Sequence, residues 1–94
     1  MVELEEVFSS RGRVRVLRLL SEMRELKITH ICERAKMSYV YASKHLLFLE
    51  KHDIVCHKTF GRVRLFRLNK NNIKALKIRD LMDHWEKTKQ PSKQ

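Results

Sequence analysis

The sequence predicts a single mainly helical α+β domain, and three observations lead to that prediction. Apolar residues recur at helical spacing up to Asp53 and again after Asn72, whereas residues 54–68 are rich in β-branched and aromatic side chains. The chain has 94 residues, enough for one modest hydrophobic core. It contains only two glycines and one proline, which leaves little room for long flexible loops. We therefore expect one domain over residues 1–88 and a flexible tail over 89–94.

The N-terminal part predicts a short acidic segment followed by a long helix. Residues 2–8 place Leu4, Val7 and Phe8 at helical spacing, but this segment is too short to form a stable helix alone. From Ser10 onward the sequence RGRVRVLRLLSEM has an apolar side with Val16, Leu17 and Leu20, and a basic side with Arg11, Arg15 and Arg18. Those three arginines either form a solvated face or contact phosphate groups. Residues 22–26 are expected to form a polar connection.

Residues 27–53, KITHICERAKMSYVYASKHLLFLEKHD, predict two helices joined by a short turn. The first spans about Ile28 to Ala35 and buries Ile28, Ile31, Cys32 and Ala35; Lys27 caps it poorly, and Thr29 could cap a shorter helix instead. Lys36 and Met37 form the turn. The second helix is expected from Tyr39 to His52, because Ser38 can accept a hydrogen bond from its first turn and Ala42, Leu46 and Leu49 form one apolar stripe.

The face opposite that stripe is the candidate nucleic-acid-reading surface. It carries Ser38, Tyr39, Val40, Ser43 and Lys44, with Tyr41 beside them. A helix that buries one face and presents hydroxyls, aromatic side chains and a cation on the other suits the major groove of DNA.

Two strands and a last helix complete the predicted domain. Ile54–Phe60 and Val63–Leu68 form a β-hairpin with Gly61 and Arg62 at its turn. Arg62, with Lys58 and Arg64 nearby, either reaches phosphates and an adjacent minor groove or keeps an edge strand soluble.

The last helix begins after Asn71 or Asn72, either of which can cap it, and extends to about residue 88. Its apolar stripe of Ile78, Leu81, Met82 and Trp85, preceded by Ile73, is expected to remain uncovered and to form a dimer surface. The alternative is that the helix folds back onto its own domain.

The runs MSYVYASKHLLFLEKHDIV and KTFGRVRLFRL resemble the recognition helix and wing of ArsR-type and related winged-helix regulators, and the resemblance covers about Ser9 to Leu68. It implies a winged helix-turn-helix with a two-stranded β-hairpin wing and a C-terminal dimerisation helix. Two departures stand out. Lys36 occupies a turn position that usually holds glycine, which would cost about 1 kcal/mol if the turn keeps its geometry. The segment ELKITH has Lys27 and Thr29 where many metal-sensing members have the cysteines of ELCVCD, so that thiolate site is missing.

The charge and the absent motifs narrow the function further. Twenty-one Lys and Arg against 11 Asp and Glu give a net charge of +10, which attracts polyanions. The sequence shows no Gly-rich phosphate loop, GxSxG, HExxH or CxxC pattern, and its five histidines lack ligand spacing. We therefore expect no enzyme activity, no cofactor and no metal. Cys32 and Cys56 form no disulfide framework, and no apolar run could cross a membrane, so a cytoplasmic protein is expected.

These observations predict a transcriptional regulator that binds double-stranded DNA as a homodimer and reads an inverted repeat. One alternative is a low-specificity architectural DNA-binding protein of chromatin type. Another is a winged helix that binds other proteins, against which the charge of +10 argues, because such a module needs no field for polyanions.

Overall fold

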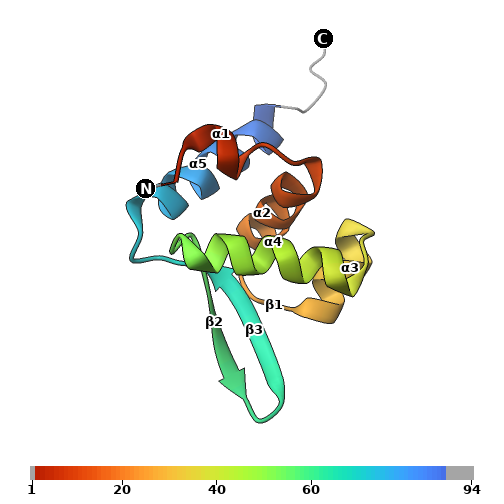
Figure 1. Cartoon of the computed structure of the whole chain (residues 1–94). Coiled ribbons are helices and arrows are strands. Elements are labelled where there is room, and N and C mark those ends of the chain that lie inside the picture. The colour runs from red at the N-terminus through yellow and green to blue at the C-terminus, as the bar shows by residue number, and fades with distance from the viewer. Residues whose placement is uncertain (1, 89–94) are drawn as a thin grey trace.

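The computed structural model describes residues 2–88; the expected flexible tail, 89–94, lies outside the described residues. Its helices are α1 (Leu4–Val7), α2 (Arg11–Met23), α3 (Ile28–Ala35), α4 (Tyr39–Lys51) and α5 (Ile73–Thr88). Its strands are β1 (Leu26–Lys27), β2 (Val55–Phe60) and β3 (Val63–Leu68). The hairpin of β2 and β3 extends away from the helices at one end of the molecule, and α1 and α5 lie together at the other end (Figure 1). This is the predicted mainly helical α+β winged helix-turn-helix.

The two helices of the motif begin and end where the local chemistry requires. The Ser38 hydroxyl accepts a hydrogen bond of 3.1 Å from the Tyr41 amide, so Ser38 is the N-cap of α4 as expected. Lys27 precedes α3 without a side-chain capping bond, and the helix nevertheless begins at Ile28 rather than at a shorter start capped by Thr29. Lys36 adopts the left-handed conformation at φ 56° and ψ 55°, so the turn keeps the geometry that usually calls for glycine.

The sheet has one strand more than the sequence predicted. Leu26 was expected in a polar connection and Lys27 at the start of the next helix, but the two residues pair antiparallel with Phe66 and Leu65 to give the strand order β1-β3-β2. In the hairpin, Phe60 pairs with Val63, and Gly61 at φ 61° makes the tight turn. The side chain of Leu26 is buried, which anchors β1 beside the base of the hairpin.

The last helix corrects part of the dimer prediction. The Asn72 side chain accepts a hydrogen bond of 2.9 Å from the Lys74 amide, so Asn72 caps α5. Ile78 and Met82 are each only 7% exposed and belong to the core; the expectation that they stay uncovered was wrong because α5 packs against α2. Ile73, Leu81 and Trp85 remain exposed.

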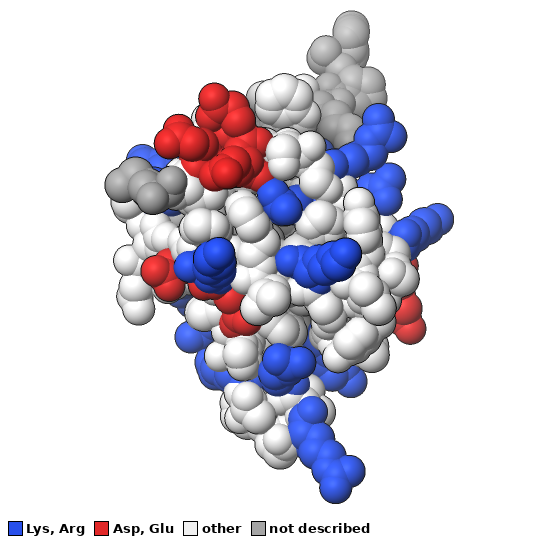
Figure 2. Space-filling view, in the orientation of Figure 1, with Lys and Arg blue, Asp and Glu red and all other residues white. Residues whose placement is uncertain are grey.

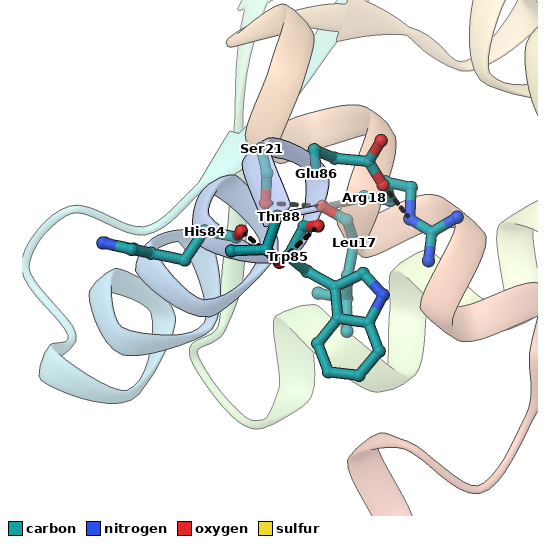
Figure 3. A network of polar contacts seen from close by, with 7 residues as sticks. All are labelled: Leu17, Arg18, Ser21, His84, Trp85, Glu86 and Thr88. Carbon is teal, nitrogen blue, oxygen red and sulfur yellow. Dashed lines mark hydrogen bonds and ion pairs between the residues drawn. The ribbon is translucent and has the colours of Figure 1, made fainter. Parts of the chain in front are cut away.

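An ion pair joins α5 to α2 near the far end of α5, and local hydrogen bonds within each helix lie around it. The Arg18 Nε atom lies 3.5 Å from a Glu86 carboxylate oxygen, and the Ser21 hydroxyl donates to the Leu17 carbonyl beneath this contact. The Thr88 hydroxyl donates to the carbonyls of His84 and Trp85. Figure 3 shows the Trp85 indole projecting away from these contacts, which leaves its ring open to solvent.

Candidate nucleic-acid interface

Helix α4 presents a row of large side chains to solvent. Tyr39 is 53% exposed, Val40 65% and Tyr41 49%, and Lys44 is exposed beside them. The opposite side of the helix is fixed in the core by Ala42, Leu46 and Leu49. The helix is therefore a rigid support that displays residues from its first turns, which is the arrangement needed to insert a helix into a DNA groove.

Sequence reasoning missed Leu47, which is 69% exposed on the same helix. It stands seven residues after Val40 and three after Lys44, so it continues their face along α4. Its position was readable from the helical period, because the buried stripe of Ala42, Leu46 and Leu49 leaves Leu47 outside. An exposed leucine between cations can contact the methyl group of thymine.

Ser43 differs from its neighbours because it is only half-exposed. With Leu47 and Glu50 it lines a groove of about 160 Å³ between α4 and the hairpin, and Arg64 and Phe66 form the other wall. A short contact between Glu50 and the His57 Nδ1 atom joins the end of α4 to β2 at this level. This contact links the base of the hairpin to the last turn of α4.

The three expected wing cations do not lie on one surface. Arg62 is exposed beside Gly61 at the tip. Arg64 stands on the sheet face of Phe66, toward α4, whereas the alternation of the strands places Lys58 on the other face. There the Lys58 Nζ atom lies 3.5 Å from a Glu25 carboxylate oxygen. Arg62 and Arg64 are therefore better placed beside α4 than Lys58 is.

A buried histidine positions α4 against α2. The side chain of His45 is only 5% exposed. The centres of the His45 and Tyr41 rings lie 4.7 Å apart, and the two rings meet edge to face. Neither nitrogen of His45 has a hydrogen-bond partner among residues 2–88. Burial, with a smaller contribution from the nearby Arg13 guanidinium, lowers the pKa of His45. The Arg13 guanidinium itself lies 3.8 Å from the centre of the Phe48 ring on α4 and also donates to the Glu6 carbonyl.

The basic side of α2 is partly used within the domain. Arg15 donates to the Ala35 carbonyl at 3.2 Å, and Arg18 pairs with Glu86. Arg11 is exposed and has no such contact among the described residues. Two of the three arginines thus hold neighbouring helices in place, which favours a structural role for them over phosphate contact.

Charge is distributed unevenly over the molecule. In Figure 2, cations are spread over the face that bears α4 and down the hairpin, with a small acidic patch at the left of this face, and the main cluster of acids lies at the top, over α1. The acids of that segment are Glu3, Glu5 and Glu6. A surface of this kind attracts a polyanion to α4 and the hairpin.

The cysteines and histidines form no group suited to a metal. Within residues 2–88 no cluster of three or more His, Cys, Asp or Glu side chains could hold a metal ion. Cys32 packs against the core as expected, and burial raises the pKa of its thiol. No helix among these residues has the length and apolar character to cross a membrane.

A DNA-binding winged helix is the class that this fold and surface define. The family described as bacterial regulatory protein, arsR family, matches residues 10–56. The chain belongs to this family of transcriptional regulators, which confirms the resemblance of the recognition helix and agrees with the prediction that the chain is not an enzyme.

Solved structures confirm the fold. HlyU from Vibrio cholerae N16961 superposes with a TM-score of 0.75 at 18% identity, over 87% of this chain and 86% of that one. The AntR antimony-specific transcriptional repressor superposes with a TM-score of 0.72 at 21% identity, over 92% of this chain and 77% of that one. ZitR from Lactococcus lactis superposes with a TM-score of 0.70 at 24% identity, over 89% of this chain and 62% of that one. No curated protein sequence matches the chain.

Proposed function

We propose that this regulator reads an inverted-repeat DNA site as a homodimer, with one α4 in the major groove of each half-site. The observation that carries the proposal is the exposed face of α4, where Tyr39, Val40, Lys44 and Leu47 project from a helix whose other side is fixed in the core. Thirteen residues make this helix about 20 Å long, which suffices to follow a major groove across several base pairs.

The hairpin supplies contacts to the DNA backbone or to an adjacent minor groove. Arg62 reaches farthest, because it sits at the turn, and a narrow A·T-rich minor groove attracts an arginine. Arg64 faces the groove beside α4 and is suited to a phosphate flanking the bases that α4 reads.

A joint surface of α1 and α5 is the proposed dimer interface. Leu4 is 65% exposed, Ile73 64%, Leu81 47% and Trp85 60%. Val2, Leu4, Phe8, Ile73 and Leu81 line one apolar groove of about 350 Å³, and Phe8, Leu81 and Trp85 line a second one beside it. A continuous exposed apolar surface of this kind marks an association site. A two-fold dimer formed there would present two copies of α4, and successive major grooves lie about 34 Å apart.

A low-specificity architectural role is the second candidate, and the composition of the α4 face favours it. Val40 and Leu47 carry no hydrogen-bonding group, so fewer side chains are available to read base edges than the length of the helix allows. The net charge of +10 would then supply most of the affinity.

A DNA titration separates the two functions. A site selected from random sequences would be compared with unselected DNA at several salt concentrations. The regulator predicts a specificity ratio of about 10³ or more, whereas a ratio near 1 would establish the architectural protein. If a dimer neutralises about 6 to 10 phosphates, log K falls with log salt at a slope of about −5 to −9. A slope near zero would contradict both functions.

The dimer is tested with charged substitutions at exposed positions. Truncation before Ile73 is unsuitable, because Ile78 and Met82 would be lost from the core. Leu81→Glu with Trp85→Glu should give folded monomers in sedimentation equilibrium and much weaker DNA binding, since each half-site then binds alone. Leu47→Glu is the matched control: it also places a carboxylate on an exposed leucine, but it should remain dimeric. Dimers in both variants would place the interface elsewhere.

A further inference from the structure

A second basic site lies away from α4, where the end of α2, the end of β3 and one side of α5 meet. They enclose a pocket of about 320 Å³. Arg67 and Leu68 reach it from the end of β3. The groove beside α4 is lined by Arg64 and Phe66 from the same strand, and it shares no lining residue with this pocket. The pocket is therefore separate from the surface proposed to read DNA.

The pocket holds an excess of positive charge. Four cations, Arg24, Arg67, Lys70 and Arg79, line it together with one acid, Glu25. The Glu25 carboxylate is already shared, at 3.6 Å from Arg67 and 3.5 Å from Lys58. Among residues 2–88, Arg24, Lys70 and Arg79 have no hydrogen bond or ion pair from their side chains. Arg79 is half-buried, whereas Arg24 and Lys70 are exposed, so these three side chains are available to an anion that enters the pocket.

Arg24 is held at the rim of this pocket by a strained turn. Its backbone has φ 70° and ψ −67°, and the Glu25 amide donates to the Met23 carbonyl at 2.8 Å across it. This is a γ-turn with positive φ, which a residue with a Cβ atom rarely adopts. Backbone strain of this kind is concentrated at ligand-binding and functional sites. The turn directs the chain so that Arg24 stands opposite Arg79 and Lys70 around one cavity.

We propose that this pocket binds a small organic phosphate. Guanidinium groups form paired, charge-assisted hydrogen bonds with phosphate oxygens, and three cations without partners match the charge of a phosphate dianion. The remaining wall is apolar, with Leu20, Met23 and Leu68, and can contact the organic part of such a ligand. Ligand sites combine an apolar wall with a few polar groups in this way. Because the pocket joins α2, β3 and α5, the ligand would connect the DNA-reading part of the domain to α5.

The test is a ¹⁵N NMR titration of the full chain with phenyl phosphate and with inorganic phosphate, at constant ionic strength. Phenyl phosphate should give saturable shifts confined to residues 20–25, 67–70 and their α5 neighbours around Arg79, and it should bind more tightly than inorganic phosphate. Arg79→Gln should weaken it about tenfold or more, as expected for a lost charged hydrogen bond. If Arg79→Gln does not fold, Lys70→Gln replaces it in this test, because Lys70 is exposed; this variant should also weaken phenyl phosphate binding.

Arg62→Gln is the matched control, since it removes the same charge at the tip of the hairpin. It should leave phenyl phosphate binding within about twofold, because the charge is far from the pocket. Shifts that do not saturate, or equal weakening by Arg62→Gln, would show only a general attraction of anions and overturn the proposal. Equal affinity for inorganic phosphate would overturn its organic part.

DNA is the other source of phosphate, and a 20-base-pair duplex distinguishes it. The duplex should shift amides of α4 and the hairpin tip while phenyl phosphate stays bound. If instead the duplex displaces phenyl phosphate, and Arg79→Gln weakens DNA binding as much as Arg62→Gln does, the pocket holds the DNA backbone and the small-ligand proposal fails.

Discussion

The contact between α2 and α4 depends on the absence of a side chain at Gly12. A Cβ atom built there would lie 2.9 Å from the His45 Nε2 atom and 3.2 Å from the Tyr41 Cε2 atom. His45 is buried and cannot simply rotate into solvent, so Gly12→Ala must push α4 away from α2 or displace the imidazole. The same helix carries the face proposed to read DNA, so the substitution affects both stability and binding.

Two opposing effects determine the size of the change. Overpacking of a filled core costs about 1–3 kcal/mol. Replacing glycine by alanine inside a helix stabilises the folded state by up to about 1 kcal/mol. Gly12→Ala should therefore lower the free energy of unfolding by up to about 2 kcal/mol. In a His45→Ala background the main obstacle is gone, and the same substitution should stabilise by up to about 1 kcal/mol.

Urea unfolding followed by circular dichroism measures all four proteins of this cycle. A coupling free energy of about 1–3 kcal/mol between Gly12 and His45 is expected. Gly61→Ala is the matched control, because a Cβ atom there meets nothing within 4 Å while φ is 61°. It should cost about 1–2 kcal/mol by strain alone and be additive with His45→Ala. Additivity for Gly12→Ala as well would refute the steric explanation.

Three further substitutions test single elements of the structure. Lys36→Gly should raise the free energy of unfolding by about 1 kcal/mol in urea unfolding, because Lys36 occupies the left-handed region. Tyr39→Ala or Lys44→Ala should weaken binding to the preferred DNA site by about 1–3 kcal/mol in a fluorescence titration. The lowered pKa of His45 means that the unfolded chain binds the proton more readily, so stability should fall as the pH drops below about 6.5, and His45→Ala should flatten this slope.

Each of these substitutions has an outcome that would contradict it. A less stable Lys36→Gly protein would mean that the lysine side chain makes a compensating contact. Full specific affinity in both α4 variants, with unchanged circular dichroism, would remove α4 from base reading; equal weakening on all sequences for Lys44→Ala would assign that residue to phosphate. An unchanged pH slope in His45→Ala would assign the acid sensitivity to other groups.

The helix-turn-helix was predictable from the sequence because its signals are local. The hydroxyl of Ser38 and the spacing of Ala42, Leu46 and Leu49 act within one helix, and both predict α4 correctly. The hairpin was equally readable, since Gly61 separates two β-rich runs. Even Lys36, which departs from the usual glycine, adopts the expected turn, because the packing of α3 and α4 on either side outweighs about 1 kcal/mol of local strain.

The features that escaped prediction depend on distant partners. The segment Leu26–Lys27 is too short to be predicted as a strand from the sequence. It forms a strand only because it pairs with β3. Ile78 and Met82 belong to the same apolar stripe as Leu81, but the docking angle of α5 on α2 divides that stripe between core and solvent. A helical period shows which residues share a face and does not show how wide the covered strip is.

The arrangement of the candidate site was likewise only partly contained in the sequence. Lys58 and Arg64 stand at similar distances from the hairpin turn, but strand pairing places them on opposite faces, and Glu25 engages Lys58. Arg15 and Arg18 read as a basic face, yet both have partners inside the domain. A count of cations therefore overestimates the number available to DNA, and only the tertiary partners show which ones remain.

The charges of the molecule are also unevenly distributed over its surface. Glu3, Glu5 and Glu6 gather over α1, whereas over α4 and the hairpin Figure 2 shows more cations than acids. Under the proposed function, this asymmetry orients the molecule in the field of DNA with α4 and the hairpin toward the DNA. In the proposed dimer a second copy covers the exposed apolar residues of α1 and α5, which lie at the end of the molecule away from the hairpin (Figure 1).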